Sequence, residues 1–426
     1  MPFGHWVLFT GTEPFYTGVY SLLWWPFILV ADFLVYRLRG RSILSSRPWE
    51  FFLLALWSTP LWQIFEMFNL RLQNWYYVQV PFELNASFII LAFAYATVLP
   101  GVFEVADLLE GLIEKISPAG RLTARSFKVG KRLLWAHMII GIAMLILPMV
   151  WPDVFYCLIW GFAFFIFDTI CYLRGGRSLL GQLAAGDNTM LMALLVSGLI
   201  CGGVWEGWNF FARTKWIYTV PGFENLKLGE MPMLGFLGFP PFVLECYAMV
   251  NFLNLFRGGR SWELDATENK KRPGMKRKLV ITLLPIMLLF MGIADYYNLT
   301  ITTSSFNRRL DRFFAERLDE EEQAALRRIG ANHSHLFLRL DTKPEALDEA
   351  DWQYMREICT LAELRGMGLR YATVLWNAGI RKPGDLAGRH AGEILEILKA
   401  QLSESEIPYP AQVRVWLRAA DNVISE

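Results

Sequence analysis

The sequence predicts a mainly α-helical, polytopic membrane bundle of about eight spans, followed by a C-terminal soluble all-α domain. The first observation is composition: 54% of the 426 residues are apolar, 15% are aromatic and 19% are charged, and the mean hydropathy is +0.30. These values are typical of a membrane protein. The second observation is a series of apolar stretches long enough to cross a bilayer as helices. The third is a change to charged, amphipathic sequence from Phe306 onward.

Charge and cysteine content exclude several classes of protein. The chain has 41 basic and 40 acidic residues, so it lacks the strong overall field of nucleic-acid-binding proteins. The five cysteines form no Cys-x-x-Cys pair, which excludes a cysteine-based metal site of that type. His333 and His335 lack further ligands at zinc spacing. We therefore expect no metal and no cofactor.

Each apolar stretch is about 18 to 25 residues long, which suits a helix crossing about 30 Å of hydrocarbon. The stretches lie at about 15–36, 50–70, 86–109, 133–151, 153–173, 188–211, 232–256 and 279–298. The first contains Pro26 and Asp32 and lacks a basic segment before it. We therefore expect it to remain as a membrane helix and not to be cleaved as a signal peptide.

Lysine and arginine are concentrated in the loops after the first, third, fifth and seventh stretches. Short loops rich in these residues stay on the cytoplasmic side of a membrane. We expect a multi-pass protein of the bacterial inner membrane with its N-terminus outside. An even number of spans would leave the C-terminal domain outside as well.

Two gapless matches indicate an internal repeat. Residues 27–44 (FILVADFLVYRLRGRSIL) align with residues 163–180 (AFFIFDTICYLRGGRSLL). The later matched positions are Glu66 with Glu206, Asn69 with Asn209, Trp75 with Trp216, and Glu104 with Glu245. Each unit would comprise three predicted spans.

The predicted transmembrane domain covers residues 1–298. Its first unit lies at about 15–110 and its second at about 152–257, with a linker span at 133–151 between them. Because a unit of three spans ends on the side opposite its start, the linker span lets the two units run parallel around a pseudo-two-fold axis. The span at 279–298 then leads to the C-terminal domain, residues 299–426.

Acidic side chains within predicted spans are the main functional candidates, since a carboxylate in a bilayer is costly unless it faces a partner or a cavity. The candidate catalytic acids are Glu66, Glu104, Glu206 and Glu245. An acid surrounded by aromatic side chains suits proton donation to a substrate. The candidate substrate-binding residues are Asp32, Asn69, Trp75, Asp168, Trp205, Trp208, Asn209 and Trp216.

Structural roles for the same residues stay open. The two Glu-x-x-Asn pairs suit bridges between helices or caps at outer helix ends. The two aspartates stand about one turn from basic loops, where ion pairs with arginine are an equal alternative. Pro100, Pro240 and Pro241 precede the third-span acids, and they predict a helix bend whose free carbonyls line a cavity.

In the C-terminal domain, Leu364-Arg-Gly366-Met-Gly368 is a Gly-x-Gly hairpin between two short predicted helices. The stretch of about 360–421 resembles a helix-hairpin-helix-containing bacterial domain of unknown function, and it ends in the matching Pro410-Ala-Gln-Val413-Arg-Val-Trp416-Leu417. Such hairpins can bind nucleic-acid phosphate, or they can pack against a protein partner. Since residues 299–426 carry 17 basic and 20 acidic side chains, nucleic acid is the less favourable partner.

The repeated unit, over about 15–257, resembles the lycopene cyclase domain family of carotenoid biosynthesis and its hydratase relatives. The shared motifs are Asp-x-x-x-Tyr closing the first span, an acid after an aromatic residue with a later tryptophan in the second, and Pro-x-x-x-Glu in the third. The resemblance implies that membrane carboxyls protonate a polyene end and start a carbocation cyclisation without redox change.

By this resemblance, Glu66 and Glu206 match the family's second-span acid, and Glu104 and Glu245 match its third-span acid. The family's Pro-Leu-Glu-Glu run is absent, because each third span carries a single acid displaced along the helix. The function expected is binding of a membrane lipid or isoprenoid in a carboxylate- and aromatic-lined cavity. The alternative is a cyclase-like or hydratase-like enzyme, and the C-terminal domain offers a surface for a protein partner.

Overall fold

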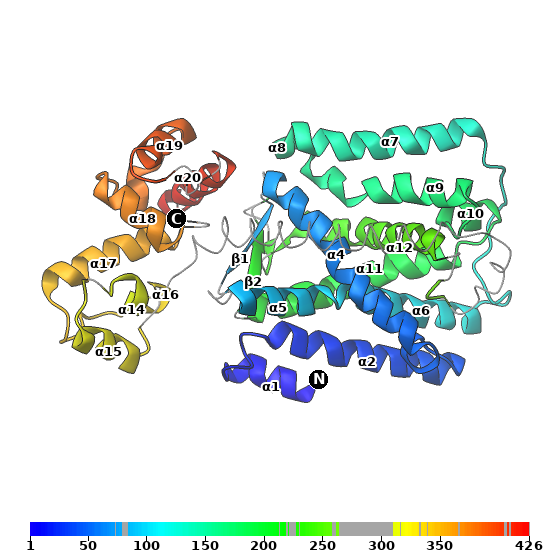
Figure 1. Cartoon of the computed structure of the whole chain (residues 1–426), viewed down its shortest axis with the longest axis horizontal. Coiled ribbons are helices and arrows are strands. Elements are labelled where there is room, and N and C mark those ends of the chain that lie inside the picture. The colour runs from blue at the N-terminus through cyan, green and yellow to red at the C-terminus, as the bar shows by residue number, and fades with distance from the viewer. Residues whose placement is uncertain are drawn as a thin grey trace. The chain divides into compact units, whose positions relative to one another are not determined.

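The computed structural model describes most of the chain (Figure 1). The described residues are 1–72, 74–78, 84–212, 214–218, 220, 227–229, 231–257, 261–263, 310–315, 317–331, 334–338, 340–364, 367–403, 407–408 and 410–425. Two compact units are present. The membrane unit comprises residues 1–75 and 83–295, and the C-terminal unit comprises residues 76–82 and 296–426. The predicted span at 279–298 and His333 lie outside the described residues.

Seven helical stretches of the described chain are long and apolar enough to cross a membrane. They are Val19–Arg39, Pro48–Asn69, Ile89–Ile116, Lys131–Val150, Tyr156–Leu173, Thr189–Phe211 and Met233–Phe256. The mainly α-helical fold with multiple membrane helices is thereby confirmed. The seven stretches coincide with the first seven predicted spans, and their ends differ from the prediction by a few residues.

The described elements up to residue 256 are α1 (Pro2–Thr10), α2 (Val19–Arg39), α3 (Ile43–Ser46), α4 (Pro48–Leu72), β1 (Trp75–Val78), α5 (Leu84–Tyr95), α6 (Val98–Ile116), α7 (Lys131–Val150), α8 (Pro152–Phe155), η1 (Tyr156–Trp160), η2 (Phe164–Asp168), α9 (Thr169–Leu173), α10 (Leu179–Ala184), α11 (Thr189–Phe211), β2 (Lys215–Tyr218), β3 (Lys227–Leu228), β4 (Met231–Pro232), η3 (Met233–Gly238) and α12 (Phe239–Phe256). The short strands β3 and β4 pair antiparallel. Helix α6 packs between α2 and α11, and α11 packs against α12. Helix α4 crosses this layer obliquely (Figure 1).

Helix α7 lies at the margin of the membrane unit (Figure 1). Its side chains Trp135 and Ile139 are 69% and 63% exposed, as suits side chains that face lipid. It packs on η1 and η2 through Gly141, where a Cβ would lie 2.6 Å from Ile166. Helix α7 is therefore the least buried of the seven candidate membrane helices of the described chain.

The third span differs from the continuous, proline-bent helix that the sequence predicts. It is divided into α5 and α6, and Pro100 lies in the first turn of α6, where its missing N–H costs no helical hydrogen bond. Two hydroxyls of α4 donate hydrogen bonds to backbone carbonyls at the end of α5. Ser58 donates to Tyr95 O at 2.5 Å, and Thr59 donates to Ala92 O at 3.1 Å. The proline therefore starts a helix instead of bending one.

The fifth and seventh spans are irregular as well. The fifth consists of the 3-10 helix η1, the π-helix η2 and the short helix α9. The seventh begins with the 3-10 helix η3, and Pro240 and Pro241 occupy the first turn of α12. Backbone of this kind is tolerated inside a membrane where neighbouring groups satisfy its hydrogen bonds.

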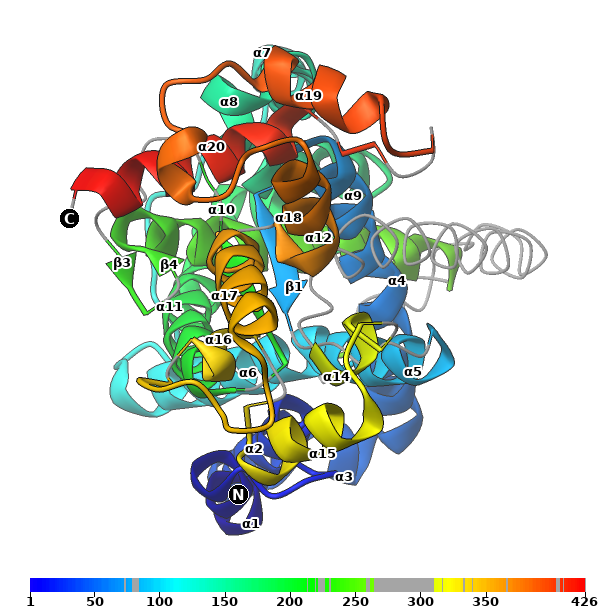
Figure 2. The same cartoon turned by 90° about the vertical axis from the view of Figure 1, so that its left-hand side faces the viewer.

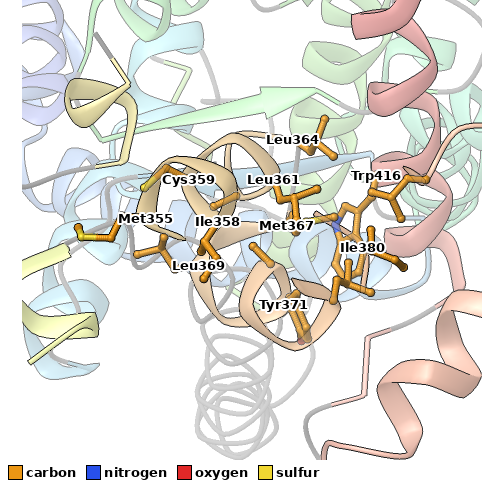
Figure 3. Close-up of a cluster of buried hydrophobic side chains, with 14 of the residues drawn as sticks. Met355, Ile358, Cys359, Leu361, Leu364, Met367, Leu369, Tyr371, Ile380 and Trp416 are labelled. Carbon is orange, nitrogen blue, oxygen red and sulfur yellow. The ribbon is translucent and has the colours of Figure 1, made fainter. Parts of the chain in front are cut away.

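From residue 310 onward the described elements are helices, which confirms a helical region after the membrane spans. It contains α14 (Leu310–Phe313), α15 (Glu320–Arg328), α16 (Ser334–Phe337), α17 (Glu349–Ala362), α18 (Gly368–Asn377), η7 (Pro383–Asp385), α19 (Ala391–Lys399) and α20 (Pro410–Ser425). Helix α17 packs on α18, and α19 packs on α20 (Figure 2). The Trp416 ring is fully buried and lies 5.0 Å from the Tyr371 ring (Figure 3).

The hairpin before α18 turns at Gly368, whose φ is +71°. A left-handed backbone of this kind favours glycine over any side chain. Gly366, the other glycine of the predicted Gly-x-Gly hairpin, lies outside the described residues. Met367 and Leu369 are fully buried in the core of the unit (Figure 3), so side chains beside the turn serve packing.

Candidate functional site

The four candidate acids are buried on four different helices of the membrane unit. Glu66 is on α4, Glu104 on α6, Glu206 on α11 and Glu245 on α12, and none is more than 3% exposed. A buried carboxyl needs hydrogen-bond partners to offset its lost hydration. Their surroundings differ, and the differences separate them into two kinds of site.

Glu66 is surrounded by aromatic donors. Its Oε1 atom accepts hydrogen bonds from Trp62 Nε1 at 2.8 Å, Trp75 Nε1 at 3.3 Å and Tyr95 OH at 3.2 Å. These donors come from α4, β1 and α5, so one carboxylate oxygen ties three elements together. Three aromatic rings are held in fixed orientation around a charge-bearing group.

Glu206 has a simpler environment. Tyr218 OH donates to Glu206 Oε1 at 2.8 Å, and burial together with this carboxylate raises the pKa of Tyr218 well above its usual value. In the predicted repeat, Gly202 stands at the position that corresponds to Trp62. There the ring of Phe239 lies so close that a Cβ on Gly202 would be 2.3 Å from it. The ring of Phe239, from the seventh span, thus lies against Gly202, at the position where the second span carries the Trp62 indole.

The two asparagines hold the loops that follow their helices. Asn69 Nδ2 donates to Trp75 O at 2.8 Å, and its Oδ1 accepts from Asn74 N at 2.9 Å. Asn209 makes the same contacts with Trp216 O at 2.9 Å and Trp216 N at 3.0 Å. Each amide therefore binds the backbone of the loop that follows its helix. This is a structural contact of the kind considered as the alternative to ligand binding.

Aromatic rings join the surroundings of Glu66 and Glu206 into one group, which we call the aromatic cluster. It consists of Trp24, Trp62, Phe65, Trp75, Trp160, Trp205, Trp216 and Phe242. Trp62 and Trp205 meet with ring centroids 5.4 Å apart, and Phe242 lies 5.8 Å from Trp62. Trp205 continues to Trp216 at 5.8 Å. Trp62, Trp160 and Trp216 are only half-buried, so the margin of the cluster is accessible.

Trp208, a predicted binding residue, lies beside this cluster. Its ring packs against Trp24 at 5.3 Å, Phe27 at 5.8 Å and the His5 ring at 6.0 Å. It therefore faces α1 and α2, whereas the other predicted tryptophans Trp75, Trp205 and Trp216 belong to the aromatic cluster. Its predicted contact with a ligand stays a prediction.

Glu245 meets the irregular fifth span. Its Oε1 accepts from the backbone N–H of Ala163 at 2.9 Å, a donor between η1 and η2. Its Oε2 has no hydrogen-bond partner among the residues that the structure describes. One oxygen of this fully buried carboxyl stabilises an interrupted helix, and the other is left without a donor.

Glu104 has different surroundings. Its neighbours are two other carboxyl groups, Asp32, with which it makes a side-chain hydrogen bond, and Asp107. Asp107 is paired with Arg39, which also bonds Glu110 at 2.8 Å. Glu104 thus lies in a cluster of acidic side chains, whereas Glu245 bonds a backbone N–H.

Asp32 and Asp168 bind backbone donors. Asp32 accepts from Leu44 N at 2.8 Å, and Asp168 accepts from Leu179 N at 2.7 Å and Leu180 N at 2.8 Å. The donors begin α3 and α10, the short helices that follow two Gly-Arg-Ser triplets, Gly40-Arg41-Ser42 and Gly176-Arg177-Ser178. Both carboxylates therefore cap the next helix, and the alternative of arginine ion pairs is not what the described contacts show. Their predicted contact with a ligand stays a prediction.

A second polar network lies at the end of the unit that carries these triplets. Tyr247 OH donates to Glu263 Oε1 at 2.7 Å and accepts from Gln182 Nε2 at 2.8 Å. Arg177 forms an ion pair with Glu263. Burial raises the pKa of Glu263 to about 7, against the opposing effect of Arg177. Neighbouring Trp262 stacks on Phe103 at 4.6 Å.

Sequence reasoning missed several of these residues. Tyr95, Phe242 and Trp160 approach the acids from other spans, and nothing in their own segments marks them. Tyr218 stands in the repeated Trp-x-Tyr pattern, at Trp216-x-Tyr218, but its contact with the acid was not predicted. The Arg257-Gly-Gly-Arg260-Ser261 stretch before Glu263 was a usable signal, since it repeats the Gly-Arg-Ser triplets after the first and fifth spans.

No protein-family model, no curated protein and no solved structure matches the chain. The likeness to the lycopene cyclase domain family and to the helix-hairpin-helix domain therefore depends on the quoted motifs alone. Within the described ranges, no group of three or more His, Cys, Asp or Glu side chains is arranged to hold a metal.

Proposed function

We propose that this integral membrane protein binds a membrane lipid or isoprenoid against the aromatic cluster. The observation that supports this is the continuity of the rings between Glu66 and Glu206, with half-buried indoles at the margin. Indole faces bind unsaturated chains through dispersion and bind electron-poor groups through their quadrupole. The carboxylate of Glu66 orients Trp62 and Trp75, so the binding surface is preorganised.

Mass spectrometry of the lipid that copurifies with the full-length protein tests this proposal. The Trp62→Leu variant is expected to retain about two- to tenfold less of the bound species, because one aromatic contact contributes about 0.5–1.5 kcal/mol beyond its buried area. Trp49→Leu is the matched control, since its indole is 64% exposed at the start of α4 and belongs neither to the aromatic cluster nor to α7. Equal retention by all three proteins would rule out binding at the cluster.

A second candidate is an isoprenoid cyclase- or hydratase-like enzyme with Glu245 as the proton donor. The specific observation is that Glu245 Oε2 is buried without a partner in the described structure. A carboxyl with one unoccupied oxygen can pass a proton to a ligand double bond and later recover it. Tryptophan faces nearby would shield the cation formed.

Expression in a lycopene-accumulating host tests the carotenoid form of this candidate. New pigments are expected from the wild-type protein and none from Glu245→Gln, whose side chain keeps the shape and the acceptor for Ala163 N–H but has no acidic proton. Glu263→Gln, which changes the other polar network, is expected to keep the activity. Unchanged pigments with a well-folded wild-type protein would exclude cyclisation of lycopene.

A further inference from the structure

The loop between α6 and α7 is an ordered arm, not an irregular connection. We call residues 121–128 the basic arm. Ala124 N donates to Gly186 O at 2.9 Å, Phe127 N donates to Ala184 O at 3.0 Å, and Asn188 N donates to Leu122 O at 2.9 Å. Leu122 N also donates to Thr189 Oγ1 at 2.9 Å. The arm is thus fixed along the connection between α10 and α11. This connection follows the second Gly-Arg-Ser triplet in the chain.

This arm and its flanks carry cations and no anions. No Asp or Glu occurs between Glu114 and Asp153. The basic residues of the same stretch are Lys115, Arg121, Arg125, Lys128, Lys131 and Arg132, all exposed. None of them forms an ion pair with a carboxylate in the described part of the chain. The backbone is fixed, and these six cations outnumber the one acid on the connection beside the arm, Asp187, which lies opposite Thr123.

The start of α7 adds two features that favour an anion at an interface. Its N-cap Gly130 supplies no side-chain cap, so the first-turn N–H groups lie beside the basic side chains without an acceptor from that residue. Phe127 is 44% exposed and Trp135 is 69% exposed. Exposed aromatic rings beside lysine and arginine, where a span begins, are typical of the headgroup layer.

We propose that the basic arm and the first turn of α7 bind the phosphate group of an anionic phospholipid. Arg121, Arg125 and Lys128 would contact the phosphate oxygens, and Phe127 would lie at the boundary with the acyl chains. Since the arm is already held by backbone hydrogen bonds, little ordering is needed on binding. This site is separate from the aromatic cluster and does not depend on the function proposed for it.

Native mass spectrometry of the full-length, detergent-purified protein tests the site, with phosphatidylglycerol and phosphatidylcholine as probes. The wild type is expected to bind phosphatidylglycerol in preference to phosphatidylcholine. Arg121→Gln/Arg125→Gln is expected to lower phosphatidylglycerol binding about fivefold or more for each cation removed. Arg121→Lys/Arg125→Lys keeps the charge and is expected to keep the preference.

Arg71→Gln/Lys215→Gln is the control, because it removes two charges outside the basic arm, one in the last turn of α4 and one in β2 after α11, and is expected to leave binding unchanged. An equal loss in both glutamine variants would show a general charge effect and overturn the proposal. Displacement of phosphatidylglycerol by inorganic phosphate at equal concentration would identify free phosphate as the ligand and would also overturn it.

Discussion

Gly198→Ala is expected to destabilise the membrane unit by about 1–3 kcal/mol, the usual cost of overpacking a tightly packed contact. A Cβ at this position of α11 would lie 2.8 Å from Phe239 O and 2.9 Å from Pro240 Cα. Both are backbone atoms at the start of α12, so the clash cannot be relieved by a rotamer change. The two helices must separate, and Phe239 must shift with them.

Thermal unfolding of the detergent-purified protein measures this effect. Gly203→Ala is the control on the same helix, since nothing lies within 4 Å of its added Cβ. The control is expected to raise stability by about 0.5–1 kcal/mol, because alanine costs less conformational entropy in a helix than glycine. A Gly198→Ala protein as stable as the control would show that α11 and α12 are not in close backbone contact.

Asp168→Ala is expected to cost about 2–6 kcal/mol, because two buried backbone donors lose their acceptor at about 1–3 kcal/mol each. The side chain is fully buried and accepts from Leu179 N and Leu180 N. Asp168→Asn keeps one acceptor oxygen and is expected to have an intermediate stability. The same thermal unfolding experiment ranks the variants.

Asp187→Ala is the matched control for this series, since Asp187 also accepts from a backbone donor, Thr189 N at 3.0 Å, and is only half-buried. A smaller loss is expected there. If Asp168→Ala left stability unchanged and instead reduced the copurifying lipid, the carboxylate would serve a ligand and not the helix cap. That outcome would favour the substrate-binding role predicted from the sequence.

Much of the membrane fold could be predicted because the length of an apolar segment can be read directly from the sequence. A run such as 189–211 has few ways to satisfy its backbone in lipid except as a helix. The breaks could not be predicted in the same way. The division between α5 and α6 depends on Ser58 and Thr59 of α4. Their hydroxyls donate to carbonyls at the end of α5 only once the helices have packed together.

The site shows the same limit. The positions of Glu66 and Glu206 were found because an acid inside a span is unusual in any context. Their partners Tyr95 and Tyr218 are ordinary residues for their segments and become donors only by tertiary contact. The helix-capping role of Asp168 has a clearer signal in the sequence. The serine of each Gly-Arg-Ser triplet is a typical N-cap, so a helix is expected to begin there, and its first N–H groups need acceptors.

The exchange of Trp62 for Gly202 has a consequence for any molecule held between the two halves. Two identical halves would present a ligand with the same environment at either end, and the ligand could bind in two equivalent directions. Here one end meets an indole hydrogen-bonded to its acid, and the other meets the ring of Phe239. The two sides of the aromatic cluster therefore differ, so even a ligand with two identical ends would meet a different environment at each end.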